Sequence, residues 1–383
     1  MKPVLQPATI DALEKTWSAP KPNRQGGSGG AAKGGRAVGR LAAVPVILAG
    51  ALSQADRSDA AIAKLQRVVK RSPQVVVKVT GRLKGVSHVA ANFKYIAGKK
   101  GRAGREDGLE TDEGERLWQT REFNQHAARW VEWDAASEFR RAPTTSISMV
   151  LSMPEGTNPD KLKDAVRAFA EKEFAGHRWV LGMHTDTPRP HAHLTVAVAG
   201  DGGERFNPRK ADLQRFREGF ARELCDRGID ADATPRRARG IVMRPEKSPI
   251  RRMRDREAQQ RAKGATPVRS RYVEKLHGEV RSRVVDHTLE TPMDAALIGR
   301  QRKTKWTYMK AVAELLRHDQ PETRKLAGEI AQFVKDMPVA ETRATELVKQ
   351  LVAAREITPA KEQGKGPSRP EVGSAPLQDG PDR

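Results

Sequence analysis

The stretch RWVLGMHTDTPRPHAHLTVAVA, residues 178–199, decides the fold of this chain. It holds two runs of alternating apolar residues joined by a proline-containing segment, which is typical of two β-strands and a turn. Side chains alternate along a strand, so His184 shares a face with Asp186, and His191 shares a face with His193. The apolar residues point to the opposite face: Trp179, Leu181, Met183, Leu194, Val196 and Val198. The pattern predicts a hairpin with its core on one face and four polar side chains on the other.

The neighbouring segments predict further elements of an α+β domain. We expect strands at residues 74–80 and 144–153, because both runs are rich in β-branched and apolar residues. Helical spacing of apolar residues predicts helices that begin near Ser87, Trp118 and Pro159, and a last helix that ends before Gly228. The polar, glycine-rich segment 99–116 predicts an exposed loop. The fold class expected is an antiparallel sheet covered by helices.

Composition divides the chain into five parts. A leader rich in Gly and Pro predicts a flexible N-terminal extension over residues 1–72, although its second half is partly helical in pattern. The core domain spans residues 73–235, and a basic arm spans residues 236–300. Residues 301–358 return to helical spacing, with one apolar stripe at Leu326, Ile330, Phe333 and Met337. The polar tail, residues 359–383, is expected to be disordered.

The chain carries a strong positive charge. It has 70 Lys and Arg against 48 Asp and Glu, a net charge of +22. The first partner to consider is therefore a polyanion, nucleic acid before an anionic membrane surface. From Arg236 to Arg271 the sequence holds 13 Lys or Arg against 3 acidic residues, which predicts phosphate binding without base readout. The candidate DNA-binding residues are Arg236, Arg237, Arg239, Arg244, Arg251, Arg252 and Arg254.

Cysteine content and hydropathy indicate a compartment. The single cysteine, Cys225, excludes an internal disulfide framework and fits a reducing environment. The apolar run at residues 41–52 is shorter than the roughly 20 residues that span a bilayer. It also lacks the compact basic region that precedes the apolar part of a signal peptide. We expect a cytoplasmic protein with no membrane span.

The three clustered histidines predict a catalytic metal site. Neutral imidazoles at His184, His191 and His193 supply three nitrogen ligands to a divalent cation and leave positions open for a substrate. Asp186 could orient one imidazole or handle a proton. Nitrogen ligands favour Mn²⁺, Ni²⁺ or Zn²⁺ by affinity, whereas cellular abundance favours Mg²⁺, and we expect Mg²⁺ or Mn²⁺. The alternative is that the histidines only form hydrogen bonds on a solvated face.

A metal that polarises a phosphate needs an attacking group, either water or a side chain. The chain has three tyrosines, at positions 95, 272 and 308. Only Tyr95 is expected on the polar face of a helix directly after the first core strand, where a phenol could reach the histidines. By itself, a tyrosine in such a place is more often a packing residue with a wet hydroxyl.

Four segments together resemble the relaxase, or mobilization nuclease, family of conjugative plasmids. They are His184-x-Asp186-x-x-x-x-His191-x-His193, which is similar to the metal-binding motif; NFKYIAGKKG at residues 92–101, which resembles the segment with the nucleophilic tyrosine; SMVLSMPEGT at residues 148–157, which resembles the strand before the middle helix; and RARG at residues 237–240, which resembles a basic segment after the last helix. The resemblance covers residues 74–245 in order and spacing.

The resemblance implies that Tyr95 attacks the phosphodiester at the nick site of a plasmid transfer origin. The products would be a 5′-phosphotyrosyl bond and a free 3′-hydroxyl. The implied partners are DNA, as single strand and duplex, accessory mobilization proteins and the coupling protein of type IV secretion. The family also implies a serine near the metal, for which Ser146, Ser148 and Ser152 are all candidates.

Two alternatives stay open. One is a replication-initiation or transposition endonuclease of the same chemistry. The other is a non-enzymatic nucleic-acid-binding protein in which the histidines are incidental.

Overall fold

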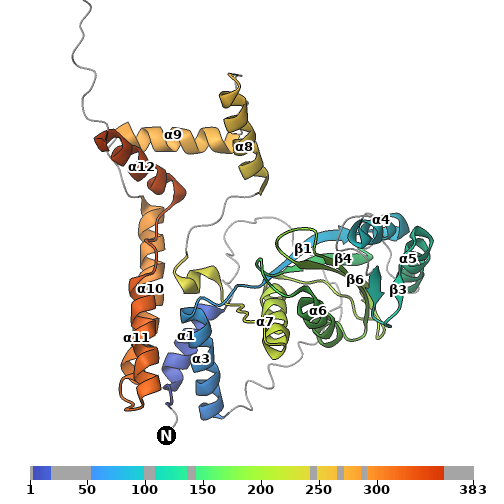
Figure 1. Cartoon of the computed structure of the whole chain (residues 1–383), viewed down its shortest axis with the longest axis horizontal. Helices are drawn as coiled ribbons and strands as arrows, with labels where there is room; N and C mark the ends of the chain where they lie inside the picture. Colours follow the sequence, from blue (N-terminus) through green and yellow to red (C-terminus); the bar gives the residue numbers. More distant parts are fainter. Residues whose placement is uncertain are drawn as a thin grey trace, which may run out of the picture. The chain divides into compact units, whose positions relative to one another are not determined.

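A computed structural model describes residues 3–18, 53–98, 108–135, 144–241, 248–264, 271–285 and 291–357 of the chain. Contacts divide the chain into two compact units (Figure 1). The first unit comprises Met1–Ile241 and Arg302–Pro338, and the second comprises Val242–Gln301 and Val339–Arg383. The boundary falls inside one long helix, so each unit is described by itself.

The first unit is built on a six-stranded antiparallel sheet with the strand order β1-β4-β6-β5-β2-β3. The strands are β1 (Val76–Leu83), β2 (Leu109–Thr111), β3 (Arg116–Leu117), β4 (Ser146–Ser152), β5 (His177–His184) and β6 (His191–Gly200). Helices cover it: α4 (Gly85–Ala97), α5 (Thr120–Ala135), α6 (Pro159–Glu173) and α7 (Lys210–Asp226). The expected α+β fold, an antiparallel sheet covered by helices, is confirmed.

The two faces of the sheet bury different helices. Phe169 of α6 and Phe216 of α7 pack with Leu194 and the other alternate apolar residues of β4, β5 and β6 in the larger core. On the opposite face, Phe93 of α4 and Trp130 of α5 form a second core against the sheet. Figure 1 shows α4 and α5 on one side of the sheet and α6 and α7 on the other. The alternate apolar residues of β5 and β6 therefore pack on one face of the sheet, as their alternation in the sequence predicted.

The segment 99–116 differs from the expected exposed loop. Residues 99–107 lie outside the described part, but Leu109–Thr111 forms the strand β2, whose three residues are all buried. Glu110 is buried in an ion pair with Arg167 of α6, with Lys163 3.9 Å away. Burial alone would raise the pKa of Glu110, but the hydrogen bond and charge of Arg167 lower it overall. The polar segment can form a buried strand because the buried carboxylate of Glu110 has cationic partners on α6.

The N-terminal segment also differs from a flexible extension, since part of it is an ordered helix. Helix α1 (Pro7–Trp17) buries Ile10, Leu13 and Trp17 against α3 (Gln54–Val69), α11 (Pro321–Lys335) and the second half of α10 (Pro292–Leu315). The apolar residues of α1 recur at helical spacing and form a face that can be buried. The composition of residues 1–40 taken as a whole is glycine-rich, and for that reason it did not predict this helix. The stripe expected on α11 is confirmed, because Leu326, Ile330, Phe333 and Met337 are all buried.

A buried tyrosine joins this helical bundle to the end of the sheet domain. The hydroxyl of Tyr308 on α10 donates a hydrogen bond to the carbonyl of Ala238 at 2.7 Å. Ala238 lies in the short helix η1 (Arg236–Arg239) that follows the sheet domain. The indole Nε1 of Trp17 donates to the same hydroxyl at 3.1 Å. Tyr308 thus links segments from both ends of the chain.

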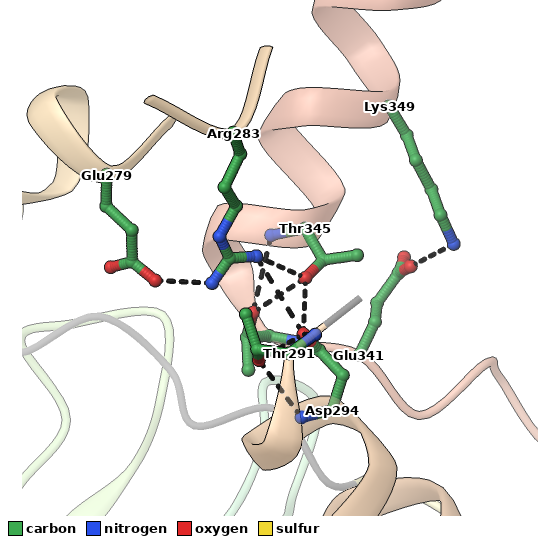
Figure 2. Close-up of polar contacts among 8 residues, drawn as sticks. Glu279, Arg283, Thr291, Asp294, Glu341, Thr345 and Lys349 are labelled. Atoms are coloured by element: carbon green, nitrogen blue, oxygen red, sulfur yellow. Dashed lines mark hydrogen bonds and ion pairs between the residues drawn. The ribbon is translucent and has the colours of Figure 1, made fainter. Parts of the chain in front are cut away.

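The second unit contains α8 (Ser248–Ala262), α9 (Arg271–Val285), α12 (Arg343–Ile357) and the start of α10. Its small apolar core includes Val280, Ala344 and Val348. Beside this core lies a polar network around Asp294, which is 1% exposed (Figure 2). Its carboxylate accepts hydrogen bonds from Thr291, Thr342 and Thr345, and Arg283 of α9 lies 3.8 Å away. The network ties α9, α10 and α12 together.

Candidate metal centre and tyrosine site

The three histidines expected to bind metal come together at one end of the β5–β6 hairpin. His184, the last residue of β5, lies directly opposite His191, the first residue of β6. His193 follows on the same face, and its ring centroid is 4.5 Å from that of His184 and 5.3 Å from that of His191. One potential ligand atom from each ring lies within 4.8 Å of the others. A four-coordinate cation with nitrogen ligands at about 2.1 Å places them roughly 3.4 Å apart, so small rotations of the rings suffice.

Hydrogen bonds orient two of the rings. His184 Nε2 lies 2.7 Å from the carbonyl oxygen of Ile96 in α4, and His191 Nδ1 lies 3.1 Å from that of Arg189. A carbonyl oxygen only accepts, so each of these nitrogens must carry the proton in the neutral ring. The lone pairs available to a metal are then on His184 Nδ1 and His191 Nε2. The donor set therefore fits a divalent cation with three neutral nitrogen ligands and open positions.

Tyr95 lies against these histidines. It occupies the last turn of α4, and its side chain is 67% exposed although its helix packs on the sheet. Its ring centroid is 5.7 Å from that of His193 and 6.5 Å from that of His184, both in edge-on arrangements. An exposed phenol beside three imidazoles is accessible to a substrate and close to a cation that they would hold. The proximity inferred from the strand-helix order is therefore present.

A short polar chain holds α4 to the sheet one turn before Tyr95. Thr195, two residues after His193 on the same face of β6, donates a hydrogen bond to Asn92 Oδ1 at 2.8 Å. Its hydroxyl also lies 3.4 Å from that of Ser148 on β4. This contact fixes α4, which carries Tyr95, to β6, which carries His191 and His193. The signal in the sequence was the i, i+3 spacing of Asn92 and Tyr95 and the i, i+2 spacing of His193 and Thr195.

Gly182 allows α4 to approach the hairpin closely. This residue faces His193 across the hairpin, and a Cβ placed on it would lie 2.7 Å from the carbonyl oxygen of Ile96. That carbonyl is the partner of His184 Nε2. Any larger residue would therefore push against the contact that orients a candidate metal ligand. Sequence reasoning did not single out this glycine.

The serines and Asp186 take different places. Ser146, Ser148 and Ser152 alternate along β4 and therefore share the face with the histidines. Ser152 lies opposite His191 in the register, Ser148 belongs to the chain with Thr195, and Ser146 is fully buried. Ser152 is thus the serine nearest the candidate metal centre in the sheet register. Asp186 is half-buried in the segment between β5 and β6.

Of the other two tyrosines, Tyr308 lies away from this group, in the same unit. Tyr308 is fully buried in the helical bundle, and burial raises its pKa. A buried phenol with a higher pKa is neither accessible to a phosphate nor easily ionised. Tyr272 lies on α9 in the second unit.

The candidate DNA-binding arginines belong to different elements of the chain. Arg237 donates to the Ser18 carbonyl and Arg239 forms an ion pair with buried Asp232, while Arg236 is exposed. Arg244 lies outside the described residues. The other three are exposed on α8 in the second unit: Arg251, Arg252 and Arg254. Arg254 also lies 3.7 Å from Asp255, so three of the seven guanidinium groups have partners within the protein.

Part of the chain matches a known protein family. Residues 95–227, about a third of the chain, match the family model described as relaxase, MobA/VirD2-like, nuclease domain. The matched segment begins at Tyr95 and contains all three histidines, and the relaxase resemblance is thereby confirmed for it. No curated protein matches the chain.

One solved structure is similar to part of the chain. It is described as "Molecular Basis of Vancomycin Resistance Transfer in Staphylococcus aureus", with 14% identity, covering 43% of this chain and 99% of that chain. Its TM-score is 0.28, so the likeness supports no conclusion about fold or function. In the described part of this chain, no helix is long and apolar enough to cross a membrane.

Proposed function

We propose that this protein is a DNA relaxase that nicks one strand at a plasmid transfer origin and becomes covalently attached to it. The observation that carries the proposal is the meeting of Tyr95 with three histidines on one face of the sheet. Phosphoryl transfer needs a nucleophile and a way to neutralise charge on the phosphate, and this arrangement offers both. The family of residues 95–227 supports it.

In the proposed reaction, Tyr95 Oη forms a bond to phosphorus while the bond from phosphorus to O3′ of the preceding nucleotide breaks. The phenol loses its proton and the departing O3′ gains one, which leaves a 3′-hydroxyl. A divalent cation, Mg²⁺ or Mn²⁺, held by His184, His191 and His193 would withdraw charge from a phosphate oxygen. Asp186 is the acidic group proposed to orient an imidazole or to take the phenol proton.

Each phosphodiester bond that breaks is replaced by one phosphotyrosyl bond. The reaction can therefore run backwards without an external energy source, which suits a strand that must be rejoined. If water attacked instead, the phosphodiester would be hydrolysed and rejoining would need an external energy source. For this reason we favour the tyrosine over water.

The proposal extends to partners. We propose plasmid DNA as the substrate in conjugation, with duplex phosphates contacted by the exposed arginines of α8 and with Arg236 and Arg244 as further contacts. We also propose accessory mobilization proteins, the coupling protein of type IV secretion and a cytoplasmic location.

A labelled oligonucleotide spanning the transfer origin of the plasmid that encodes this protein tests the reaction. With Mg²⁺ or Mn²⁺, we expect an adduct that survives denaturing electrophoresis and that carries a 3′-end label but not a 5′-end label. Tyr95→Phe and chelator should each abolish the adduct, whereas Tyr272→Phe should leave it unchanged.

The outcomes separate the alternatives. An adduct on other DNA but not on a transfer origin would favour a replication-initiation or transposition endonuclease. Binding of DNA with no adduct, no effect of chelator and no effect of His193→Ala would favour a non-enzymatic binding protein. A nick without an adduct would show that water is the attacker.

A further inference from the structure

Helix α10 carries an exposed tryptophan among positive charges, in the part of the helix that belongs to the first unit. The sequence from Arg302 to Lys310 is RKTKWTYMK, and it contains four cationic side chains and no acidic one. The indole of Trp306 is 64% exposed, and Met309 is 38% exposed. A large aromatic side chain left in water is more informative than a lone exposed leucine, because tryptophan is usually mostly buried.

Helical geometry places these side chains on one outward stripe. At 100° per residue, Arg302, Trp306, Met309 and Lys310 project within about 100° of one another. The opposite side of the same turns is the buried face, formed by Tyr308, Ala311, Val312 and Leu315 in the core of the bundle. The helix thus has one apolar face that packs and another that presents cations around a single aromatic ring.

Two cations, Arg302 and Lys310, lie on this stripe, and Lys303 and Lys305 flank it on either side. Arg302, Lys303, Lys305 and Lys310 form no ion pair with any described residue. Lys310 Nζ lies 5.9 Å from the centroid of the Trp306 ring, so one charge is held beside the indole. By contrast, Arg324 of α11 in the same bundle forms an ion pair with Asp319 at 2.7 Å. Four cations without an ion-pair partner, on the stripe and on both sides of it, favour an external anion.

We infer that this stripe, residues 302–310 of α10, binds single-stranded DNA, with Trp306 stacking on a base and the cations contacting neighbouring phosphates. Residues 302 and 310 are about 12 Å apart along the helix, which gives room for several phosphates. A nucleic acid fits better than a membrane surface, because only two apolar side chains face outward and interfacial helices present many more. Aromatic stacking between cations is a general way to hold unpaired bases without reading their sequence.

The inference deepens the proposed function, since it gives a nicking enzyme a place for the single strand outside the tyrosine site. It does not depend on catalysis, because binding can be measured in the absence of metal. It also accounts for a positive segment outside the basic arm at residues 236–300. The stripe would hold the strand without taking part in bond breaking.

Fluorescence anisotropy with a labelled single-stranded oligonucleotide of mixed sequence tests the inference in the full-length protein carrying Tyr95→Phe. We expect Trp306→Ala to weaken binding about 5- to 150-fold and Trp306→Phe to restore part of the affinity. Arg302→Gln should lower the slope of log affinity against log salt by about 0.7. Lys325→Gln, which removes an exposed charge from α11 in the same bundle, should leave both quantities unchanged. A duplex of the same sequence should be much less sensitive to Trp306→Ala, because its bases are already stacked.

Equal binding by Trp306→Ala and the parent protein would overturn the inference, as would an equal loss with Lys325→Gln or with duplex. Binding of anionic vesicles that Trp306→Ala abolishes, with no change in DNA affinity, would assign the stripe to a membrane instead. Failure of the proposed nicking reaction appears separately, as the absence of an adduct in the protein with Tyr95 intact. The anisotropy result stands in either case.

Discussion

Replacing Gly182 with alanine should disable the site while leaving its chemical groups in place. The new Cβ would lie 2.7 Å from the Ile96 carbonyl oxygen, where a normal contact is longer than 3 Å. Both partners are backbone, so α4 must move by roughly half an ångström to relieve the overlap. That movement shifts Tyr95, one residue earlier in the helix, relative to His184 and His193.

The size of the effect follows from two general observations. Inserting a methyl group into a well-packed region costs about 1–3 kcal/mol of stability. A displacement of about 1 Å between reacting groups can lower a rate by about 100-fold. For a shift of roughly half that distance we expect the rate of adduct formation to fall about tenfold or more. Binding of DNA should change little, since no DNA-contacting group is removed.

The assay is single-turnover adduct formation with saturating oligonucleotide and metal, alongside thermal unfolding. Gly81→Ala is the matched control, because its Cβ would meet only Leu83 Cδ2 at an ordinary 3.6 Å. Asn92→Ala, which removes the hydrogen bond from Thr195 without adding bulk, should slow the same step. A folded Gly182→Ala protein that forms adduct at the rate of the Gly81→Ala control would refute the reasoning.

Three further changes address stability. Asp294→Ala should destabilise the second unit by about 3–5 kcal/mol in chemical denaturation, because it removes the buried acceptor of hydrogen bonds from Thr291, Thr342 and Thr345 and one of the two carboxylates beside Arg283, whereas Asp319→Ala, at a surface ion pair, should cost less than about 1 kcal/mol. Burial lowers the pKa of His126 from 6.5, so the unfolded chain binds a proton that the folded chain does not. The free energy of unfolding should therefore fall as the pH drops from about 7.5 towards 5.5, and His126→Phe should show a smaller fall; equal falls would count against this reasoning. Gly328→Ala on α11 has open space around the new methyl group and should raise the melting temperature by stabilising the helix about 1 kcal/mol; a decrease would contradict this.

Much of the fold around the site could be predicted because strands impose a strict alternation. The spacing of His184, His191 and His193 placed them on one face as soon as the hairpin was recognised. The short strand β2 could not be predicted, because Glu110 looks like a surface residue until Arg167, 57 positions away, is known to neutralise it. The residues around Glu110 in the sequence do not indicate a partner so far away in the chain.

The site itself was predictable only in part. The polar face of α4 indicated Tyr95, but its distance from the histidines depends on Gly182 and on the bond between Asn92 and Thr195. These are contacts between a helix and strands about ninety or more residues later in the chain, and no periodicity encodes them. The stripe on α10 escaped prediction for another reason. Its cations were visible in the sequence, but only the packing of Tyr308 shows which side of the helix is left in water.

The contact of α1 with α10 has a consequence for synthesis of the protein. Thr9 donates a hydrogen bond to Glu314, 305 residues later in the chain. A ribosome adds about 5–20 residues per second, so the part of α1 that meets α10 must wait on the order of tens of seconds for its partner, whereas α3 follows soon after α1. The sheet domain between them can complete its own core in that interval. During synthesis the sheet domain would thus be folded while the helix pair α1–α3 still exposes the apolar surface that α10 and α11 later cover.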